Sequence, residues 1–459
     1  MSRKKIEIIN TVLYNLVFLL TVILMGSCTP GGGGGGEAGL LTGVTWVDDP
    51  PGPDFTDIFF SRSIDGGATF EPPVNVSATA GSSSKPVLAI FGRTVLIAWV
   101  DDTPGTSNIF LTRSTNGGVT FEPPVNVSNT LGDADSPQLA VSGSSVLVVW
   151  TNTTLGNSEL LVRRSTDGGA TFEPPVNVSN NQIINSYGFE LAFSGSTVLI
   201  AWEALIAFPS NANIFVARSD DGGATFGLPV NVYASSGTSE NPRIAISGST
   251  VLIAWEEWMA GVTTDIYVSR STDGGATYGP PTNVSNTAGF SEAHRIAISG
   301  TTIIIAWEDT VQPIHDILVV RSSDSGATFG PPVNLTPSHP IGVSMFPWVM
   351  NFGSDFVITW MEETNPNGNS DILITRSTDS GVTFGAPVNV SNDTGDSTYP
   401  QVVTSGSMLL SSWFDNTPGS YGIFVARSSD EGGTFGPPVT VSTLAVDIPQ
   451  YYDFKIATP

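Results

Sequence analysis

Several residues that could serve binding or catalysis interrupt the pattern that the rest of this 459-residue sequence follows. Aromatic side chains beside carboxylates and arginines are suited to holding a sugar or a peptide. The departing residues between positions 243 and 348 are Arg243, Trp258, His294, Arg295, His315, His339, Phe346 and Trp348. Tyr187, Glu190 and Tyr399 occupy comparable positions elsewhere. Ordinary variation among surface loops would produce the same departures, so the pattern alone does not decide between a site and loop drift.

A second set of candidate residues consists of carboxylates that closely follow a tryptophan. They are Asp48, Asp49, Asp101, Asp102, Glu203, Glu256, Glu257, Glu308, Asp309, Glu362, Glu363 and Asp415. Gathered on one face, they would attract cations or a basic partner. A solvated acidic rim, or hydrogen bonds that cap a sheet, would explain the same series. Calcium prefers oxygen ligands and stays open as a cofactor, although no EF-hand loop is present. The histidines lack the short spacing of zinc ligands.

These residues are carried by a unit that the sequence repeats eight times. The clearest mark is Ser-Ile-Asp-Gly-Gly-Ala-Thr-Phe, which begins at Ser63. Close copies begin at Ser114, Ser165, Ser219, Ser271, Ser322, Ser377 and Ser428. A fixed period of this length, between 51 and 55 residues, indicates a solenoid, a propeller or another repeat array.

Each unit contains four short runs that are predicted to be strands. In the fifth unit these runs are residues 243–247, 251–255, 265–270 and 282–285. They are rich in β-branched and aromatic residues and are bounded by Gly, Pro, Ser and Asp. Four strands in about 52 residues, repeated with one period, are typical of a propeller blade.

The two ends of the repeat region predict how the array closes. The first unit begins with its second run, at residues 41–46, and therefore lacks a first run. Residues 449–457 align with first runs such as the one that begins at Pro400. We therefore predict an all-β fold: an eight-bladed propeller of four-stranded antiparallel blades over residues 40–459, closed by the C-terminal strand pairing into the first blade, so that no sheet edge is left open. A parallel β-helix is the alternative, but it would leave that strand without partners.

The repeated loop resembles the Asp-box, or BNR repeat, of sialidases and related propellers. The resemblance covers residues 40–459 and implies that the loop joins the third and fourth strands on the face opposite the active site. In such a turn Asp accepts hydrogen bonds from backbone amides, and Gly tolerates unusual dihedral angles. We expect a structural role for the box, for the arginine before it and for the tryptophan in each unit. Asn116 replaces one box aspartate.

The same resemblance names catalytic candidates, because sialidases use three arginines, a Tyr–Glu pair and an aspartate. Arg243, Arg295, Tyr399 and Glu190 are the candidates here. The ligand-binding candidates are Arg243, Arg295, His294, His315, Trp258, Trp348, Glu256 and Glu308. The constellation is incomplete, since only Lys85 could stand for the third arginine and a lysine lacks the bidentate fork. Known sialidases also have six blades. An inverting glycosidase would need only two facing carboxylates.

The N-terminus has the order of a secretory signal. Basic residues at positions 3–5 precede an apolar stretch over about residues 11–25, and small residues precede Cys28. This order resembles the lipobox of bacterial lipoproteins, which implies cleavage after residue 27 and a lipid on the Cys28 thiol. Residues 28–39 then form a Gly-rich tether. A membrane-spanning anchor is the alternative, but about 15 apolar residues are short for a span.

Composition narrows the classes of function. The net charge of −25 argues against nucleic acid as a partner, because phosphate binding needs a basic surface. The single cysteine excludes an internal disulfide framework. The sequence therefore predicts an exported propeller, anchored to the cell envelope by its lipid, that binds a surface glycan or protein. A sialidase-like glycoside hydrolase and a purely structural surface protein are the alternatives.

Overall fold

A computed structural model describes residues 41–459, apart from positions 49–54, 104, 131, 154–156, 181–184, 208–210, 260–262, 312–313, 338–341, 364–368, 406, 418 and 444–453. The predicted signal, Cys28 and the tether lie outside the described residues, as do Asp49 and His339. No helix among the described residues is long and apolar enough to cross a membrane.

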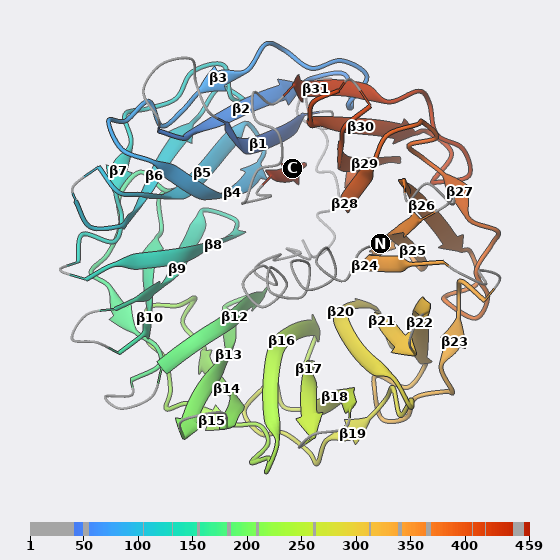
Figure 1. Ribbon diagram of the computed structural model, residues 1–459. Coiled ribbons are helices and arrows are strands. Elements are labelled where there is room, and N and C mark those ends of the chain that lie inside the picture. Colours follow the sequence, from blue (N-terminus) through green and yellow to red (C-terminus); the bar gives the residue numbers. More distant parts are fainter. Residues whose placement is uncertain are drawn as a thin grey trace, which may run out of the picture.

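The described chain forms a closed ring of eight four-stranded antiparallel sheets, which confirms the predicted propeller (Figure 1). We number the blades 1 to 8 in chain order and name the strands of each blade from the channel outwards. The first strands are β32 (Phe454–Ala457), β4 (Ser83–Phe91), β8 (Ala134–Ser142), β12 (Asn185–Ser194), β16 (Thr238–Ser247), β20 (Phe290–Ser299), β24 (Ser344–Phe352) and β28 (Ser397–Ser405). The second strands are β1 (Thr42–Asp48), β5 (Thr94–Asp101), β9 (Ser145–Asn152), β13 (Thr197–Ala207), β17 (Thr250–Met259), β21 (Thr302–Val311), β25 (Asp355–Glu363) and β29 (Met408–Asp415).

The fourth, outermost strand has only two residues in seven of the eight blades. The third strands are β2 (Asp57–Ser63), β6 (Asn108–Ser114), β10 (Glu159–Ser165), β14 (Asn211–Ser219), β18 (Thr263–Ser271), β22 (Ile314–Ser322), β26 (Ser370–Ser377) and β30 (Gly422–Ser428). The fourth strands are β3 (Val74–Asn75), β7 (Val125–Asn126), β11 (Val176–Asn177), β15 (Val230–Asn231), β19 (Thr282–Asn283), β23 (Val333–Asn334), β27 (Val388–Asn389) and β31 (Val439–Thr443). Such short outer strands offer little open edge to another chain.

The C-terminal strand closes the ring as predicted. β32 pairs antiparallel with β1, so that Val44 lies opposite Ile456. Phe454 is buried and meets Phe414 of blade 8 edge to face, with ring centroids 4.7 Å apart. The Gln401 side chain in blade 8 also donates a hydrogen bond to the Phe454 carbonyl, at 2.9 Å. The last strand therefore belongs to blade 1 and holds blade 8 against it.

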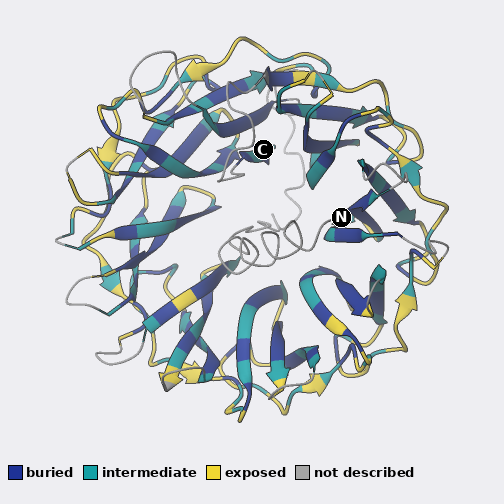
Figure 2. Cartoon of the chain, in the orientation of Figure 1, coloured by how far each residue is buried: buried dark blue, intermediate teal, exposed yellow. Residues whose placement is uncertain are grey.

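The core lies between neighbouring blades. The tryptophan of every second strand is almost fully buried, as Trp99 and Trp307 illustrate at 0% exposure. Trp99 also stacks on Phe110 of the third strand, with ring centroids 6.3 Å apart. Each hydrophobic cluster takes residues from two adjacent blades, and exposed residues lie mainly along the outer rim (Figure 2). The tryptophans therefore pack blade against blade, as expected.

The repeated loop is a hydrogen-bonded turn after each third strand. In the first box the hydroxyl of Ser63 donates to Asp65 and accepts the N–H of Gly67. The N–H and hydroxyl of Thr69 donate to the Asp65 carboxylate at 2.9 and 2.6 Å. Gly67 has a φ of 82°, and a Cβ there would lie 2.7 Å from Leu410 of blade 8. The box thus fixes its own turn and fits closely against the preceding blade.

Candidate functional site

The sequence-predicted site residues lie away from the boxes. The box follows the end of the third strand, where Ser63 pairs with Thr42 at the start of β1. The opposite end of the blades, where first strands begin and second strands end, is what we call the site face. The structure separates the candidates into an outer group of glutamates on this face and an inner group near the middle of the first strands, beside the channel.

The inner group brings four predicted residues together at one register. Glu190, Arg243, Arg295 and Trp348 occupy equivalent positions on the first strands of blades 4 to 7. Arg243 Nη1 lies 3.4 Å from Glu190 Oε2, with the two side chains 7% and 10% exposed. The Arg295 guanidinium lies over the Trp348 ring, 5.6 Å from its centroid. Each contact ties one blade to the next.

The space between these four side chains is small. They line a cavity of about 30 Å³, which is room for about one water molecule. Burial raises the pKa of Glu190 despite the nearby Arg243. Burial and the charge of Arg243 together lower the pKa of Arg295 to about 9. The inner group is therefore a polar contact between neighbouring blades.

The Tyr–Glu pair that the resemblance implied is not assembled. Tyr399 lies on β28 in blade 8 and stacks on Phe346, with ring centroids 4.7 Å apart. Burial raises the pKa of Tyr399 to about 12. Glu190 lies on β12, across the ring from β28 (Figure 1). Lys85, the substitute for a third arginine, pairs with Asp135 at 2.7 Å. The structure thus joins Arg243 to Glu190 but leaves Tyr399 and Lys85 elsewhere.

The outer group is a row of five glutamates on blades 4 to 6, which we call the glutamate row. Its members are Glu203, Glu240, Glu256, Glu292 and Glu308. Glu240 lies directly opposite Glu256 in blade 5, and Glu292 directly opposite Glu308 in blade 6. In blade 4 Glu203 faces a tyrosine at the same register. Blades 2, 7 and 8 have the pairs Ser84–Val100, Met345–Met361 and Thr398–Phe414 there, and blade 3 has Asp135–Thr151. Among the described pairs, glutamates at this register therefore lie only on blades 4 to 6.

Two members of the row are buried and each contacts a predicted histidine. Glu256 accepts hydrogen bonds from the Asn241 amide and the Ala293 N–H, both at 2.8 Å. His294 Nδ1 lies 3.4 Å from Glu256 Oε1. His315 Nδ1 lies 2.8 Å from Glu308 Oε1. The structure thus places each of the two predicted histidines against a predicted glutamate.

Within the row, some carboxyl groups have raised pKa values and one has a lowered pKa. Burial and neighbouring carboxylates raise the pKa of Glu203 and of Glu292 to about 8, and that of Glu240 to about 7. Burial would also raise the pKa of Glu256, but hydrogen bonds from His294 and Asn241 outweigh it and lower that pKa. At neutral pH the row therefore combines an ionised carboxylate with others that readily hold a proton.

Sequence reasoning missed Glu240 and Glu292 and named Glu203 only as one of the carboxylates that follow a tryptophan. The first strands carry a register shift just after the two missed residues, between Glu240 and Arg243 and between Glu292 and Arg295. Simple alternation counted back from the arginines therefore places them on the wrong side of the sheet. The signal that could have found them is their place opposite the residue that follows each tryptophan.

The carboxylates two residues after the tryptophans have a different role. Asp101, Glu257, Asp309, Glu362 and Asp415 are buried. Glu257 accepts hydrogen bonds from Trp255 Nε1 at 2.9 Å and from the Ser239 hydroxyl at 2.6 Å. These five residues cap the sheet with hydrogen bonds and do not form a solvated rim. Among the described residues no group of three or more His, Cys, Asp or Glu side chains is placed to hold a metal ion.

The blades that carry the glutamate row also have long second strands with exposed apolar ends. β13, β17 and β21 contain 11, 10 and 10 residues, compared with 7 in β1 and 8 in β5. Ile206, Met259 and Val311 are 43%, 44% and 55% exposed, each three residues beyond a glutamate of the row. Tyr187 and Phe290 are also exposed, and Trp258 lies 6.2 Å from the Phe290 ring.

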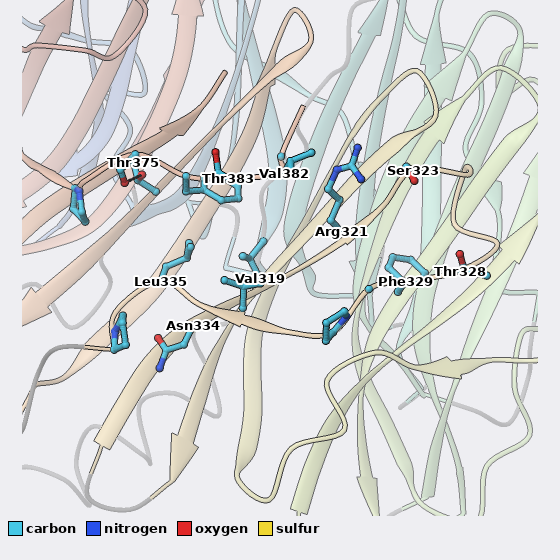
Figure 3. Close-up of a pocket in the computed structure, with 18 residues that line it drawn as sticks. Val319, Arg321, Ser323, Thr328, Phe329, Asn334, Leu335, Thr375, Val382 and Thr383 are labelled. Atoms are coloured by element: carbon cyan, nitrogen blue, oxygen red, sulfur yellow. Dashed lines mark hydrogen bonds between the residues drawn. The ribbon is translucent and has the colours of Figure 1, made fainter. Parts of the chain in front are cut away.

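A larger cavity lies away from this face. It has a volume of about 680 Å³ and lies between blades 6 and 7, beside the boxes (Figure 3). Phe329 and Leu335 of blade 6 and Val382 and Phe384 of blade 7 line it, together with Arg321. These residues belong to the repeated box and fourth-strand segments, and none of them is a sequence-predicted site residue.

Comparison with known proteins supports the architecture. No protein-family model and no curated protein matches this sequence. Among solved structures, a puromycin-hydrolysing peptidase from Mycobacterium tuberculosis is 13% identical, with a TM-score of 0.50 over 82% of this chain and 55% of that one. A Hadza microbial sialidase is 17% identical, with a TM-score of 0.39 over 76% of this chain and 77% of that one. An α-L-arabinofuranosidase from Fusarium graminearum is 15% identical, with a TM-score of 0.39 over 64% of this chain and 91% of that one. At these identities the likeness concerns the fold alone.

Proposed function

We propose that this chain is a binding module displayed on the cell envelope, anchored by a lipid on Cys28, and that its ligand lies on the site face of blades 4 to 6. The ligand is a surface glycan or protein. One observation carries this proposal: only these blades, among the described residues, combine the glutamate row with exposed apolar strand ends. Because the boxes and tryptophans are shared by all blades, the unshared face is where a specific ligand would be recognised.

The inner group supports binding over sialidase chemistry. Arg243 already pairs with Glu190, and the adjoining cavity holds about one water molecule. A sialidase site would need these side chains free and next to a tyrosine, whereas Tyr399 is in blade 8. The arrangement favours a ligand that lies across the face over a monosaccharide held inside a pocket.

A second candidate function rests on the opposed pKa values in the glutamate row. Glu256 has a lowered pKa, whereas burial and the charge of Glu256 both raise the pKa of Glu292. One ionised and one protonated carboxyl group are the parts of glycoside hydrolysis by acid and base. In this role Glu256 would act as base or nucleophile and Glu292 as general acid.

The proposed function can be tested with full-length protein in mild detergent. We would probe glycan and peptide arrays with the wild type, with Met259→Asp/Phe290→Asp, and with Leu228→Asp/Val382→Asp as a control near the boxes. The proposal predicts array binding that the first variant loses and the control keeps. In parallel, fluorogenic sialosides and other glycosides would be assayed between pH 4 and 8.

Each result of these assays has a defined meaning. Binding that both variants retain, or no binding to either array, would overturn the proposed site. Sialoside turnover that disappears in Arg243→Ala would replace the binding module with a sialidase-like enzyme. Turnover of another glycoside that disappears in Glu256→Gln and in Glu292→Gln would establish the second candidate.

A further inference from the structure

The uncompensated negative charge of the site face narrows the chemical class of its partner, provided that the proposed function holds. Glu203, Glu240 and Glu292 are partly exposed, and none of them has an ion-pair partner among the described residues. Carboxylates near the boxes differ in this respect, as Glu71 shows by its 2.8 Å contact with Arg62. Burial raises the pKa of all three, and the charge of the neighbouring Glu256 raises each of them further. A cationic group placed between them would remove this repulsion.

The buried part of the row has an incomplete polar contact of its own. His294 is 1% exposed and directs Nδ1 toward Glu256, but its Nε2 has no hydrogen-bond partner in the described part of the chain. A buried imidazole nitrogen without a partner costs free energy. Glu256 and Glu308 already have contacts within the blades, so the partly exposed glutamates are the ones available to a ligand.

The exposed apolar strand ends lie on the same three blades as the partly exposed glutamates. Ile206, Met259 and Val311 end the second strands of blades 4 to 6 or lie one residue from that end. Each of these blades therefore offers an exposed aliphatic side chain and one partly exposed glutamate at its site-face end. Exposed apolar groups gathered on one face indicate an interaction surface.

We propose that this face docks a basic, amphipathic protein segment in which lysine or arginine alternates with apolar residues. Its cationic heads would pair with Glu203, Glu240 and Glu292, and its apolar side chains would cover the exposed strand ends. Long basic side chains suit this arrangement, because their aliphatic stems can lie on apolar surface while the charge reaches a carboxylate. The net charge of −25 would speed the encounter with such a partner.

The aliphatic character of the strand ends favours a protein over a glycan. Sugar rings are rich in hydroxyl groups, and covering Ile206, Met259 and Val311 with them would bury polar groups without partners. A peptide with apolar side chains buries the same surface favourably. A glycan that carries amino groups would satisfy the carboxylates but not the aliphatic ends, so it is the outcome to be distinguished.

Calorimetry on the full-length protein in mild detergent tests this proposal. The probe is a peptide of alternating lysine and leucine, with a glutamate–leucine peptide and a chitosan oligosaccharide for comparison. In Glu203→Gln/Glu240→Gln/Glu292→Gln we expect the Kd for the lysine peptide to weaken at least tenfold. The matched control, Glu122→Gln/Glu173→Gln/Asp220→Asn, removes the same number of carboxyl groups near the boxes and should change the Kd less than twofold.

A second variant and two conditions make the test independent of folding defects in the first. Ile206→Ser/Met259→Ser/Val311→Ser changes only exposed side chains and should also weaken the lysine peptide at least tenfold. Binding should weaken as salt is raised from 50 to 300 mM. It should strengthen from pH 6.5 to 8.5, because the unpaired glutamates ionise in that range.

The outcomes separate this inference from the proposed function. Equal losses in the glutamate variant and its control would show charge steering without docking and would overturn the inference. Chitosan binding that needs the row, without peptide binding, would also overturn it but would leave the binding module standing. No binding of either probe, together with empty arrays, would remove the proposed function as well.

Discussion

At the scale of single residues, the second box has Asn116 where the other seven have an aspartate. Asn116 Oδ1 accepts the Thr120 N–H at 3.0 Å, and its Nδ2 donates to the Thr120 hydroxyl at 2.8 Å. In the fourth box Asp221 instead accepts both the N–H and the hydroxyl hydrogen of Thr225. These bonds lower the pKa of Asp221 to about 2. A charged acceptor makes stronger bonds than an amide does.

Asn116→Asp should therefore stabilise the protein at pH 7. We expect the free energy of unfolding to rise by about 0.5–1 kcal/mol, the difference between neutral and charge-assisted hydrogen bonds at a surface turn. Because the folded-state pKa of such an aspartate lies below its unfolded value, the gain exists above about pH 4 and is lost as the pH falls toward 2. Thermal unfolding at pH 7 and pH 3 measures it.

The reverse substitution in another box provides the control. Asp221→Asn should lower the free energy of unfolding at pH 7 by a similar amount and have a smaller effect at pH 3. If Asn116→Asp left stability unchanged at pH 7 while Asp221→Asn reduced it, the second box would hold its turn by contacts that the charge does not influence.

At the scale of elements, the first strands decide which residues reach the site face. Their register shifts coincide with residues in the left-handed region, including Asn241 at φ 55°, Ala293 at 53° and Tyr399 at 54°. Blade 4 has Gly188 at the corresponding place, with φ 40°. These bulges reverse the alternation of side chains within the strand.

The bulges explain why the elements were predictable but the site only partly so. Composition, repeat period and turn residues were enough to predict the strands, because every unit repeats the same hydrophobic pattern. The positions of Glu240 and Glu292 depend on the extra residue in each first strand, which no propensity marks when it is Ala. The incomplete catalytic constellation was recognisable from its missing arginine. The Arg243–Glu190 contact was not, since it needs the spatial relation of two blades.

Ala293→Gly tests the cost of the bulge in blade 6. A left-handed conformation costs an alanine about 1–2 kcal/mol, while glycine gives up about 0.4–1 kcal/mol through the greater freedom of the unfolded chain. We therefore expect a net gain of about 0.5–1 kcal/mol in the free energy of unfolding, measured by denaturant titration. Ala297→Gly, in the same strand but buried and without positive φ, should be destabilising. A loss in both variants would mean that the bulge stores no strain.

At the scale of the whole molecule, the closed ring forces the carboxylates of three blades together. Closure by β32 leaves the blades no freedom to separate, so Glu203, Glu240 and Glu292 stay partly buried beside other carboxylates. The fold was predictable at this scale because the C-terminal segment visibly supplies the missing first strand. The electrostatic consequence was not, because it arises only when separate repeats meet.

The ring should therefore lose stability as its glutamates ionise. Their folded-state pKa values, about 7 for Glu240 and about 8 for Glu203 and Glu292, exceed the usual value of 4.5. The folded state thus binds more protons than the unfolded state, and stability decreases as the pH rises through these values. Between pH 6.5 and 8.5 we expect a loss on the order of 2 kcal/mol in the free energy of unfolding, after allowance for partial exposure.

The pH window is chosen so that other groups do not hide this loss. The pKa of His294 is lowered, so this group changes the free energy of unfolding mainly below about pH 6.5. The pKa of Arg295 is about 9, so this group changes it mainly above the window. Glu203→Gln keeps the neutral form at all pH values and should flatten the decline, whereas Glu122→Gln near a box should not. Denaturant titrations at pH 6.5, 7.5 and 8.5 measure both slopes. A wild-type stability that is constant or rises over this range would show that the row ionises without repulsion, and that a cation already compensates it.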